Sequence, residues 1–126
     1  MKERRYSFVV TCYNLEKYIA ECLDSLIRQD FDSNLFEIIC VDDGSYDNST
    51  RIIKDYEQRG LMIQTFFIAN GGLEKACNLG VRQARFERVI RVDGDDVLFP
   101  DYLTRMDAAI KEDPGYDFYY CGDYVE

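Results

Sequence analysis

Short runs of apolar and β-branched residues recur along the chain, and each interval between them is long enough to hold a helix. Runs of this length, bounded by turn residues, are typical of buried strands. A turn is expected at Pro114-Gly115, before the last run. The predicted strands cover residues 6–12, 36–41, 61–68, 88–92 and 117–125.

The first two intervals have apolar residues at helical spacing, so each predicts a helix with one buried face. Asn14 stands where an N-cap is expected for the first helix, and Asn48 or Ser49 where one is expected for the second. Gly60 is expected to end the second helix. The apolar positions of the two helices are Leu15, Tyr18, Ile19, Cys22, Leu23, Leu26, Ile52, Ile53 and Tyr56.

Two more helices are predicted in the second half of the chain. One covers residues 73–84 and has Leu73, Ala76, Cys77 and Val81 on one side. The other begins near Pro100, which favours the first turn of a helix, and runs to about residue 111.

Strands and helices therefore alternate through the whole chain, which predicts an α/β fold. Connections of this length make neighbouring strands parallel and place helices on both faces of the sheet. In such sheets, ligands bind beyond the carboxyl ends of the strands. A polar cluster follows each of the first four predicted strands, so these clusters are expected to meet at one edge.

The net charge of the chain limits the classes of ligand that are expected to bind at this edge of the sheet. The chain has 15 basic and 24 acidic residues, which gives a formal net charge of −9. Nucleic acid is disfavoured as a partner because phosphate contacts need clustered Lys and Arg. An anionic nucleotide is expected to bind only if a divalent cation stands between its phosphates and the protein carboxylates.

The chain has no histidine, which excludes Ser-His and Cys-His catalytic pairs. Any metal must then be held by carboxylates, which favours Mg²⁺ or Mn²⁺. The five cysteines are scattered and odd in number, so reduced core residues are expected rather than disulfides or a zinc site. No apolar run approaches the ~20 residues of a membrane span, and no signal-peptide core is present. The chain is therefore predicted to be cytoplasmic.

The run Asp93-Gly94-Asp95-Asp96 is the first candidate for chemistry. Three carboxylates within four residues repel one another, and a divalent cation relieves that repulsion. A solvated acidic loop is the alternative, and the run alone does not decide between them. A calcium EF-hand is disfavoured because Thr104 stands at the twelfth position from Asp93, where that loop has Glu.

The other clusters suggest nucleotide recognition. Asp42 and Asp43 follow the second strand, where a carboxylate can accept hydrogen bonds from a base or a ribose, although a structural Asx turn is the alternative. Thr11 and Tyr13 offer a hydroxyl group and an aromatic face beside a nucleobase, with side-chain packing as the alternative. Asn78 is a polar residue on a helix otherwise made of small residues, and close helix packing explains that composition equally well.

Taken in order, these clusters resemble the inverting family 2 glycosyltransferases of the GT-A fold. The resemblance covers residues 8 to about 102. Each motif is weak alone, but four motifs in the same order at corresponding strand ends are specific. The matching segments are Val9-Val10-Thr11-Cys12-Tyr13-Asn14, Ile39-Cys40-Val41-Asp42-Asp43-Gly44-Ser45 with Asp47, Asn70, Gly71, Gly72, Ala76 and Asn78, and Val92-Asp93-Gly94-Asp95-Asp96 with Pro100.

The resemblance implies a role for each candidate in binding a nucleoside-diphosphate sugar. Thr11 and Tyr13 would line the base pocket, which Asn78 would support, and Asp43 with Asp42 beside it would bind the base.

The DxD motif of the family would be Asp93 with Asp95. Asp95 and Asp96 would hold Mn²⁺ or Mg²⁺, the Lewis acid that stabilises the leaving nucleoside diphosphate. Two positions depart from the family pattern. Cys77 stands where an arginine is usual, and Phe86 where a glycine is usual.

The resemblance predicts a Rossmann-like GT-A fold, with residues 1–126 forming a single nucleotide-sugar-binding domain and the acceptor-binding C-terminal half absent. The expected activity is transfer of a hexose to a saccharide, lipid-linked or cell-envelope acceptor in polysaccharide biosynthesis, at the inner face of the membrane. The general base is not assigned within this chain. A non-catalytic nucleotide-sugar-binding or scaffolding module is the alternative. A nucleotidyltransferase is disfavoured because the first strand is not followed by a glycine-rich basic loop.

Overall fold

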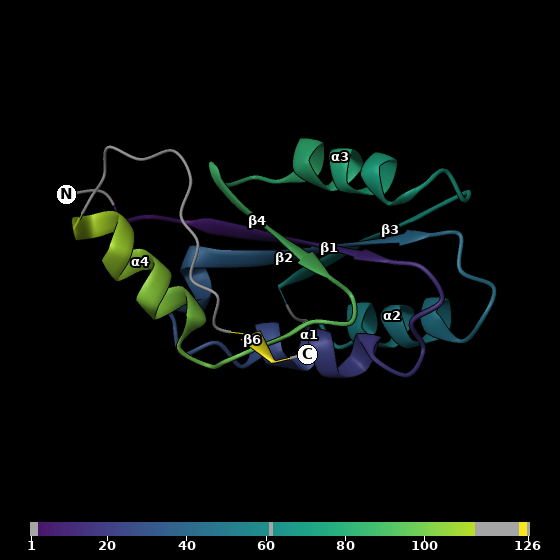
Figure 1. Cartoon of the computed structure of the whole chain (residues 1–126), viewed down its shortest axis with the longest axis horizontal. Helices are drawn as coiled ribbons and strands as arrows, with labels where there is room; N and C mark the ends of the chain where they lie inside the picture. The colour runs from purple at the N-terminus through teal and green to yellow at the C-terminus, as the bar shows by residue number, and fades with distance from the viewer. Residues whose placement is uncertain (1–2, 61, 113–123, 126) are drawn as a thin grey trace.

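The structure is a computed structural model that describes residues 3–60, 62–112 and 124–125. Strands and helices alternate along it, as predicted (Figure 1). In chain order the elements are β1 (Tyr6–Cys12), α1 (Ile19–Ile27), a 3₁₀ turn (Ser33–Leu35), β2 (Phe36–Asp43), α2 (Ser49–Gln58), β3 (Ile63–Ile68), α3 (Leu73–Gln83), β4 (Arg88–Asp93), β5 (Val97–Leu98), α4 (Tyr102–Glu112) and β6 (Tyr124–Val125).

Four strands form one parallel sheet in the order β3-β2-β1-β4, which confirms the predicted α/β class. In the register of this sheet, Thr11 of β1 is opposite both Val41 of β2 and Asp93 of β4. The predicted last strand is found only at β6, which pairs antiparallel with β5. The rest of that strand and the turn predicted at Pro114-Gly115 lie outside the described residues.

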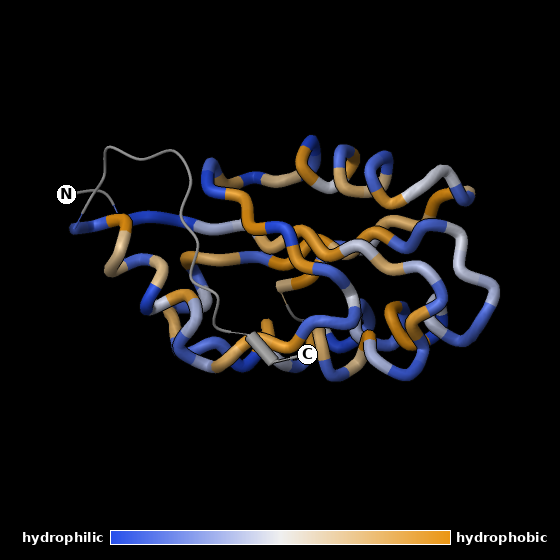
Figure 2. The backbone as a smooth tube through the Cα atoms, in the orientation of Figure 1, coloured by the Kyte–Doolittle hydropathy of each residue, from blue (hydrophilic) through white to orange (hydrophobic). Residues whose placement is uncertain are grey.

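Helices cover both faces of the sheet, with α3 on one face and α1 and α2 on the other (Figure 1). The larger core lies on the face of α1 and α2, where Phe8 and Val10 of β1 and Ile38 of β2 pack with apolar residues of α1, α2 and α4. A smaller cluster of Ile39, Val41 and Ala76 lies under α3. Figure 2 shows hydrophobic residues concentrated along the strands and hydrophilic residues in the connecting loops.

Helix α3 packs on the sheet through small residues. Its buried positions are Ala76, Cys77 and Gly80. Of the four residues predicted to lie on one side of this helix, Ala76 and Cys77 are buried, whereas Leu73 and Val81 are 43% and 45% exposed. A Cβ atom added to Gly80 would lie 2.4 Å from Val9 Cγ1, so the missing side chain is what allows this close approach to β1.

Helix α1 begins later than predicted. The expected N-cap at Asn14 is wrong, because α1 starts at Ile19 and a turn closed by the Leu15 carbonyl precedes it. Asn14 instead adopts a left-handed backbone conformation with φ of 53°. The start of α2 at Ser49 agrees with the predicted cap position, and Gly60, with φ of 72°, follows its end as expected.

A buried carboxylate ties α3 back to the sheet at the amino-terminal ends of the strands. Glu37 of β2 accepts hydrogen bonds from Ser7 Oγ at 2.6 Å, Arg85 N at 2.7 Å and Arg85 Nε at 2.8 Å. Burial alone would raise the pKa of Glu37, but these hydrogen bonds outweigh that effect and lower the pKa. Glu37 therefore remains charged, although its residue is only 2% exposed.

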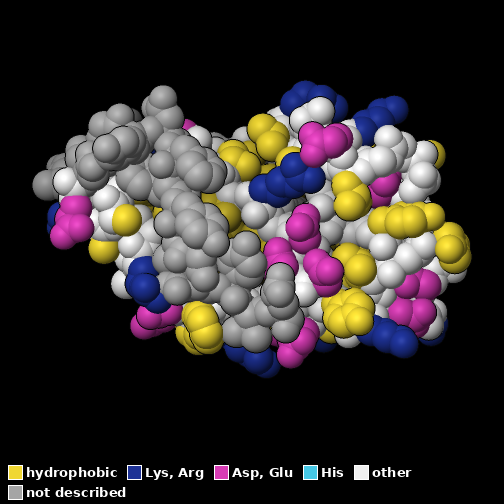
Figure 3. Space-filling view, viewed as in Figure 1, with side chains coloured by type: hydrophobic (Ala, Val, Ile, Leu, Met, Phe, Trp, Pro, Cys, Tyr) yellow, Lys and Arg dark blue, Asp and Glu magenta, His cyan; other side chains and the backbone are white. Residues whose placement is uncertain are grey.

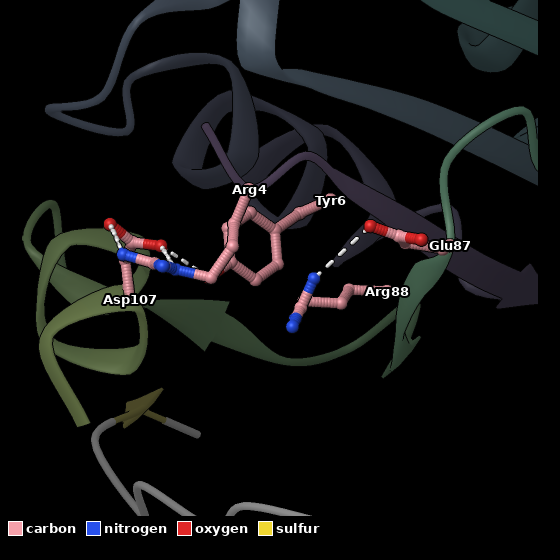
Figure 4. A network of polar contacts seen from close by, with 5 residues as sticks. All are labelled: Arg4, Tyr6, Glu87, Arg88 and Asp107. Atoms are coloured by element: carbon pink, nitrogen blue, oxygen red, sulfur yellow. Dashed lines mark hydrogen bonds and ion pairs between the residues drawn. The ribbon is translucent and has the colours of Figure 1, made fainter. Parts of the chain in front are cut away.

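A second polar contact attaches α4 to the start of the chain (Figure 4). Asp107 of α4 accepts hydrogen bonds from Arg4 Nε and from Tyr6 Oη, each at 2.6 Å. Burial would raise the pKa of Asp107, and the two donors lower it overall. The neighbouring ion pair, Arg88 with Glu87, lies at the start of β4.

The described cysteines, Cys12, Cys22, Cys40 and Cys77, are free and buried, as predicted, while Cys121 lies outside the described residues. Within the described part of the chain, no helix has the length and apolar character needed to cross a bilayer.

We predict that Gly80→Ala lowers the free energy of unfolding by about 1–3 kcal/mol, because the new methyl group collides with Val9. The same change in an open helix would stabilise it by roughly 0.5–1 kcal/mol, so the sign of the effect is diagnostic. Urea denaturation measures it. The penalty should shrink in a Val9→Ala background, which removes the colliding Cγ1 atom. A stabilising Gly80→Ala would contradict the packing described here.

We predict that Glu37→Gln destabilises the protein at neutral pH by about 1–3 kcal/mol, because it weakens charge-assisted hydrogen bonds at a buried site. The pKa of Glu37 is lowered on folding, so its contribution is present above the pKa of an unfolded glutamate and is lost as the pH falls through the folded-state pKa. Unfolding measured from pH 7 into acid should show the two proteins converging. Glu87→Gln, in an exposed ion pair, is the control and should change little.

Candidate functional site

The carboxyl ends of the four parallel strands lie at one edge of the sheet, toward the right of Figure 1. Three loops leave this edge toward α1, α2 and α3, and a fourth leads from β4 to β5. All the candidate residues of the sequence except Asn78 lie at strand ends or in these loops. The sheet thus collects residues that are up to 85 positions apart in the chain, from Thr11 to Asp96.

The loop after β4 gathers three carboxylates. Oxygen atoms of Asp93, Asp95 and Asp96 all lie within 4.8 Å of one another. Gly94 makes this tight turn possible, because its N–H donates to the Thr11 carbonyl at 2.9 Å and an added Cβ atom would also lie 2.9 Å from that oxygen. The Asp96 amide closes the turn by donating to the Asp93 carbonyl at 2.9 Å.

Asp42 and Asp43 are adjacent in β2, and their side chains therefore lie on opposite faces of the sheet. Asp42 is buried and accepts hydrogen bonds from the hydroxyl groups of Ser45 and Thr50. It holds the loop into α2 and the first turn of that helix. The structure therefore separates these two candidates, which the sequence placed side by side.

Asp43 faces the α3 side and anchors the loop between β3 and α3. Its carboxylate accepts hydrogen bonds from Gly71 N at 2.9 Å and Gly72 N at 3.0 Å. Asn70 Nδ2 also donates to the Asp43 carbonyl at 3.1 Å. Gly44 packs against this loop so closely that an added Cβ atom would lie 2.6 Å from Asn70 N. Asp43 is only 1% exposed, so its carboxylate is buried as well as hydrogen-bonded.

The loops after β1 and β2 are joined by hydrogen bonds. The backbone N–H of Asn14 donates to Ser45 Oγ at 2.9 Å, and its side-chain Oδ1 accepts from the backbone N–H of Tyr46 at 3.0 Å. This pairing brings Tyr13 beside Tyr46, with ring centroids 6.1 Å apart and planes at 80°. Tyr46 is 84% exposed and was missed in the sequence, where nothing distinguishes it from an ordinary loop residue.

Thr11 is 1% exposed, and its Oγ1 atom is buried with no hydrogen-bond partner among the described residues. Buried hydroxyl groups are rarely left in this state, so this atom is available to a polar ligand or a water molecule. Asn78 is different. It lies on the exposed side of α3, and no hydrogen bond joins it to another candidate in the described chain.

A cleft of about 210 Å³ borders the acidic cluster. Its lining residues are Ile90, Arg91, Val92, Asp93, Asp96, Leu98 and Tyr102. Arg91 was missed in the sequence, although its position two residues before Asp93 in a strand places both on the same face. Arg91 Nη1 donates to Glu74 Oε1 at 2.9 Å, so an ion pair connects β4 to the first turn of α3.

Cysteine chemistry is disfavoured at this edge. Burial raises the pKa of Cys12 to about 11, so its thiol is protonated at neutral pH. A protonated, buried thiol is a poor nucleophile and a poor metal ligand. The groups suited to chemistry here are therefore the carboxylates.

Comparison with known proteins connects this geometry to one family. Residues 7–125 match the family model of glycosyl transferase family 2. The glycosyltransferase EpsJ of Bacillus subtilis is 39% identical over 120 residues, which make up 95% of this chain and 34% of EpsJ. The poly(ribitol-phosphate) beta-N-acetylglucosaminyltransferase TarS of Staphylococcus aureus is 38% identical and matches 86% of this chain, but only 19% of its own length.

Solved structures agree on the fold. The crystal structure of TarS residues 1–349 in complex with UDP-GlcNAc superposes with a TM-score of 0.78 and 38% identity, over 86% of this chain and 31% of that one. The mannosyltransferase PcManGT of Pyrobaculum calidifontis, in complex with GDP-Man and Mn²⁺, gives a TM-score of 0.75 and 26% identity, over 85% and 32% of the two chains. The chain thus spans about a third or less of the length of these relatives.

We predict that Asp43→Asn speeds amide hydrogen exchange at Gly71 and Gly72, because their N–H groups lose the carboxylate that accepts from them. The amide of Ala76 donates to the Gly72 carbonyl within the first turn of α3 and should keep its protection. Exchange followed by NMR or mass spectrometry resolves the two regions. Unchanged protection at both glycines would show that Asp43 does not hold this loop.

Proposed function

The chain belongs to glycosyl transferase family 2, and we propose that it binds a nucleoside-diphosphate sugar through a divalent cation held by Asp93, Asp95 and Asp96. The convergence of these three carboxylates beside a cleft is the observation that carries the proposal. Its second support is that relatives of known structure bind UDP-GlcNAc, or GDP-Man with Mn²⁺.

The donor atoms fit Mn²⁺ or Mg²⁺. Both are hard cations that prefer carboxylate oxygens, and the described chain places no nitrogen ligand or buried thiol in the cluster. Oxygen ligands about 2.1 Å from one Mg²⁺ lie at most about 4.2 Å from one another. The observed spread, within 4.8 Å, needs only a small closing movement of the side chains. A bound cation would drive that movement, because it attracts the three carboxylates and offsets their mutual repulsion.

We assign the other candidate residues at this edge of the sheet to binding the nucleotide. Thr11 Oγ1, buried without a partner in the described chain, would bind a polar group of the base or ribose. Tyr13 would cover the base with its ring, and Asp43 would accept a hydrogen bond while it holds the loop before α3. Asp42 would act indirectly, by fixing the loop that carries Ser45. For Asn78 we retain only a supporting role on α3.

The bound cation would act as a Lewis acid that stabilises the leaving nucleoside diphosphate, as metals do in phosphoryl and glycosyl transfer. The residues of this chain would orient the diphosphate and hold the base. Because the chain spans about a third or less of its relatives, the proposal concerns the donor half of the reaction. Transfer to a saccharide or lipid-linked acceptor, at the cytoplasmic face of a membrane, remains a prediction from the sequence.

Calorimetric titration tests the proposal. UDP and GDP are each titrated into the protein with saturating Mn²⁺ and with EDTA, and one of them should bind only when Mn²⁺ is present. Asp95→Asn should weaken that binding by about 10–100-fold or more. Loss of a residue that only orients a metal ligand already has an effect of this size. Asp55→Asn removes the same charge from an exposed ion pair on α2 and is the matched control.

Failure of both nucleotides to bind with Mn²⁺, or equal binding by Asp95→Asn, would refute the proposal. The same samples separate an enzyme from a binding module. Slow hydrolysis of UDP-GlcNAc or GDP-Man that depends on Asp95 would indicate a transferase donor site, whereas tight binding without turnover would favour a non-catalytic module.

A further inference from the structure

Arg91 occupies a distinctive position next to the acidic cluster. It lies on the same face of β4 as Asp93, two residues earlier in the strand. Helix α3 packs on β1 and β2 and leaves this face of β4 open, so Val89, Arg91 and Asp93 are all exposed. Figure 3, which views the sheet from the side of β4, shows basic and acidic side chains next to one another near the middle of the molecule, where β4 ends in Figure 1.

The charges around the cleft indicate what Arg91 would contribute to binding a diphosphate. One divalent cation does not neutralise the three carboxylates of the cluster, so a diphosphate would still approach a site of net negative charge. Among the described residues that line the cleft, Arg91 is the one basic side chain. A planar guanidinium binds phosphate oxygens through two hydrogen bonds at once, which a lysine ammonium cannot do.

Glu74 determines where the guanidinium lies before a ligand arrives. The ion pair joins Arg91 Nη1 to Glu74 Oε1 at 2.9 Å, and the two side chains are 44% and 81% exposed. An exposed pair of this kind contributes little to stability, because both charges remain solvated. Exchange of Glu74 for a phosphate group therefore costs little, and Arg91 is already one of the residues that border the cleft.

We infer that Arg91 is a diphosphate-binding residue of the donor site, and that Glu74 holds its guanidinium on the side of β4 that carries Asp93 until the diphosphate of the ligand replaces the glutamate. This inference rests on the proposed function, and it assigns a residue that the carboxylate cluster alone does not account for. Arg91 would bind the diphosphate directly, whereas Glu74 would be a positioning residue that competes with the ligand.

The test compares two affinities in each protein. One is the affinity for Mn²⁺ alone, and the other is the affinity for UDP or GDP at saturating Mn²⁺, using the nucleotide that the unmodified protein binds. Arg91→Gln should weaken nucleotide binding roughly tenfold or more, since it removes charge-assisted hydrogen bonds. It should leave Mn²⁺ affinity unchanged or raise it, because a positive charge beside the metal site is gone.

Glu74→Gln should leave nucleotide binding unchanged or strengthen it, and Arg91→Lys should recover only part of the lost affinity. Arg59→Gln is the matched control, because Arg59 forms a similar exposed ion pair with Asp55, at 3.1 Å, near the end of α2 at the opposite edge of the sheet. It should change neither affinity.

Two results would overturn the inference. One is wild-type nucleotide affinity in Arg91→Gln, and the other is a parallel loss of Mn²⁺ and nucleotide affinity, which indicates a structural role. Absence of nucleotide binding in the unmodified protein is a different outcome, which rejects the proposed function and the inference with it.

Discussion

The parallel pairing of β1 with both β2 and β4 is the constraint on which the candidate site depends. Because the three strands run in the same direction and in close register, Cys12 is opposite Asp42 while Thr11 is opposite Asp93. Residues from three distant parts of the chain therefore end at one edge. The register of β1 with β2 is strongly specified, since the side chains of both strands are buried along their whole length. The loops are then joined to one another by hydrogen bonds from side chain to backbone.

Similar carboxylates have different surroundings at this edge of the sheet. Asp42 and Asp43 lie within the sheet and are surrounded by hydroxyl and amide groups that satisfy them. Asp93 and Asp95 lie at the exposed end of an edge strand, and with Asp96 they face one another. In the proposed site, the buried and satisfied carboxylates would shape the binding surface, whereas the clustered ones would attract the cation. The position of each residue in the strand register, and not its type, is the basis of this assignment.

The sequence predicted the strands well because burial on both faces leaves a continuous apolar signal. The bounds of β1 were predicted to the residue, and the gathering of Asp93, Asp95 and Asp96 followed from the position of the loop at a strand end. Helix faces and loop contacts were harder. The close packing at Gly80 has no hydrophobic signature, and Val81, which was grouped with Ala76 and Cys77 on one side of the helix, is exposed.

The remaining misses have the same origin, since they are contacts between segments that are not adjacent in sequence. Asparagine is a residue type favoured at helix N-caps, but Asn14 instead forms hydrogen bonds with Ser45 and Tyr46 in the loop after β2. The pairing of Arg91 with Glu74 joins a strand to a helix 17 positions earlier and is set by the crossover geometry. No local pattern contains that information.

The contact of Gly44 with the Asn70 backbone has a consequence for how such a protein can diversify. Two loops that touch through their main chains cannot change length independently, since an insertion in either would push the other out of place. New specificities would therefore have to arise by exchange of side chains at fixed loop lengths, or from segments grafted elsewhere. Directed evolution of this scaffold should accordingly begin with substitutions at exposed rim positions such as Tyr46, and not with insertions in these two loops.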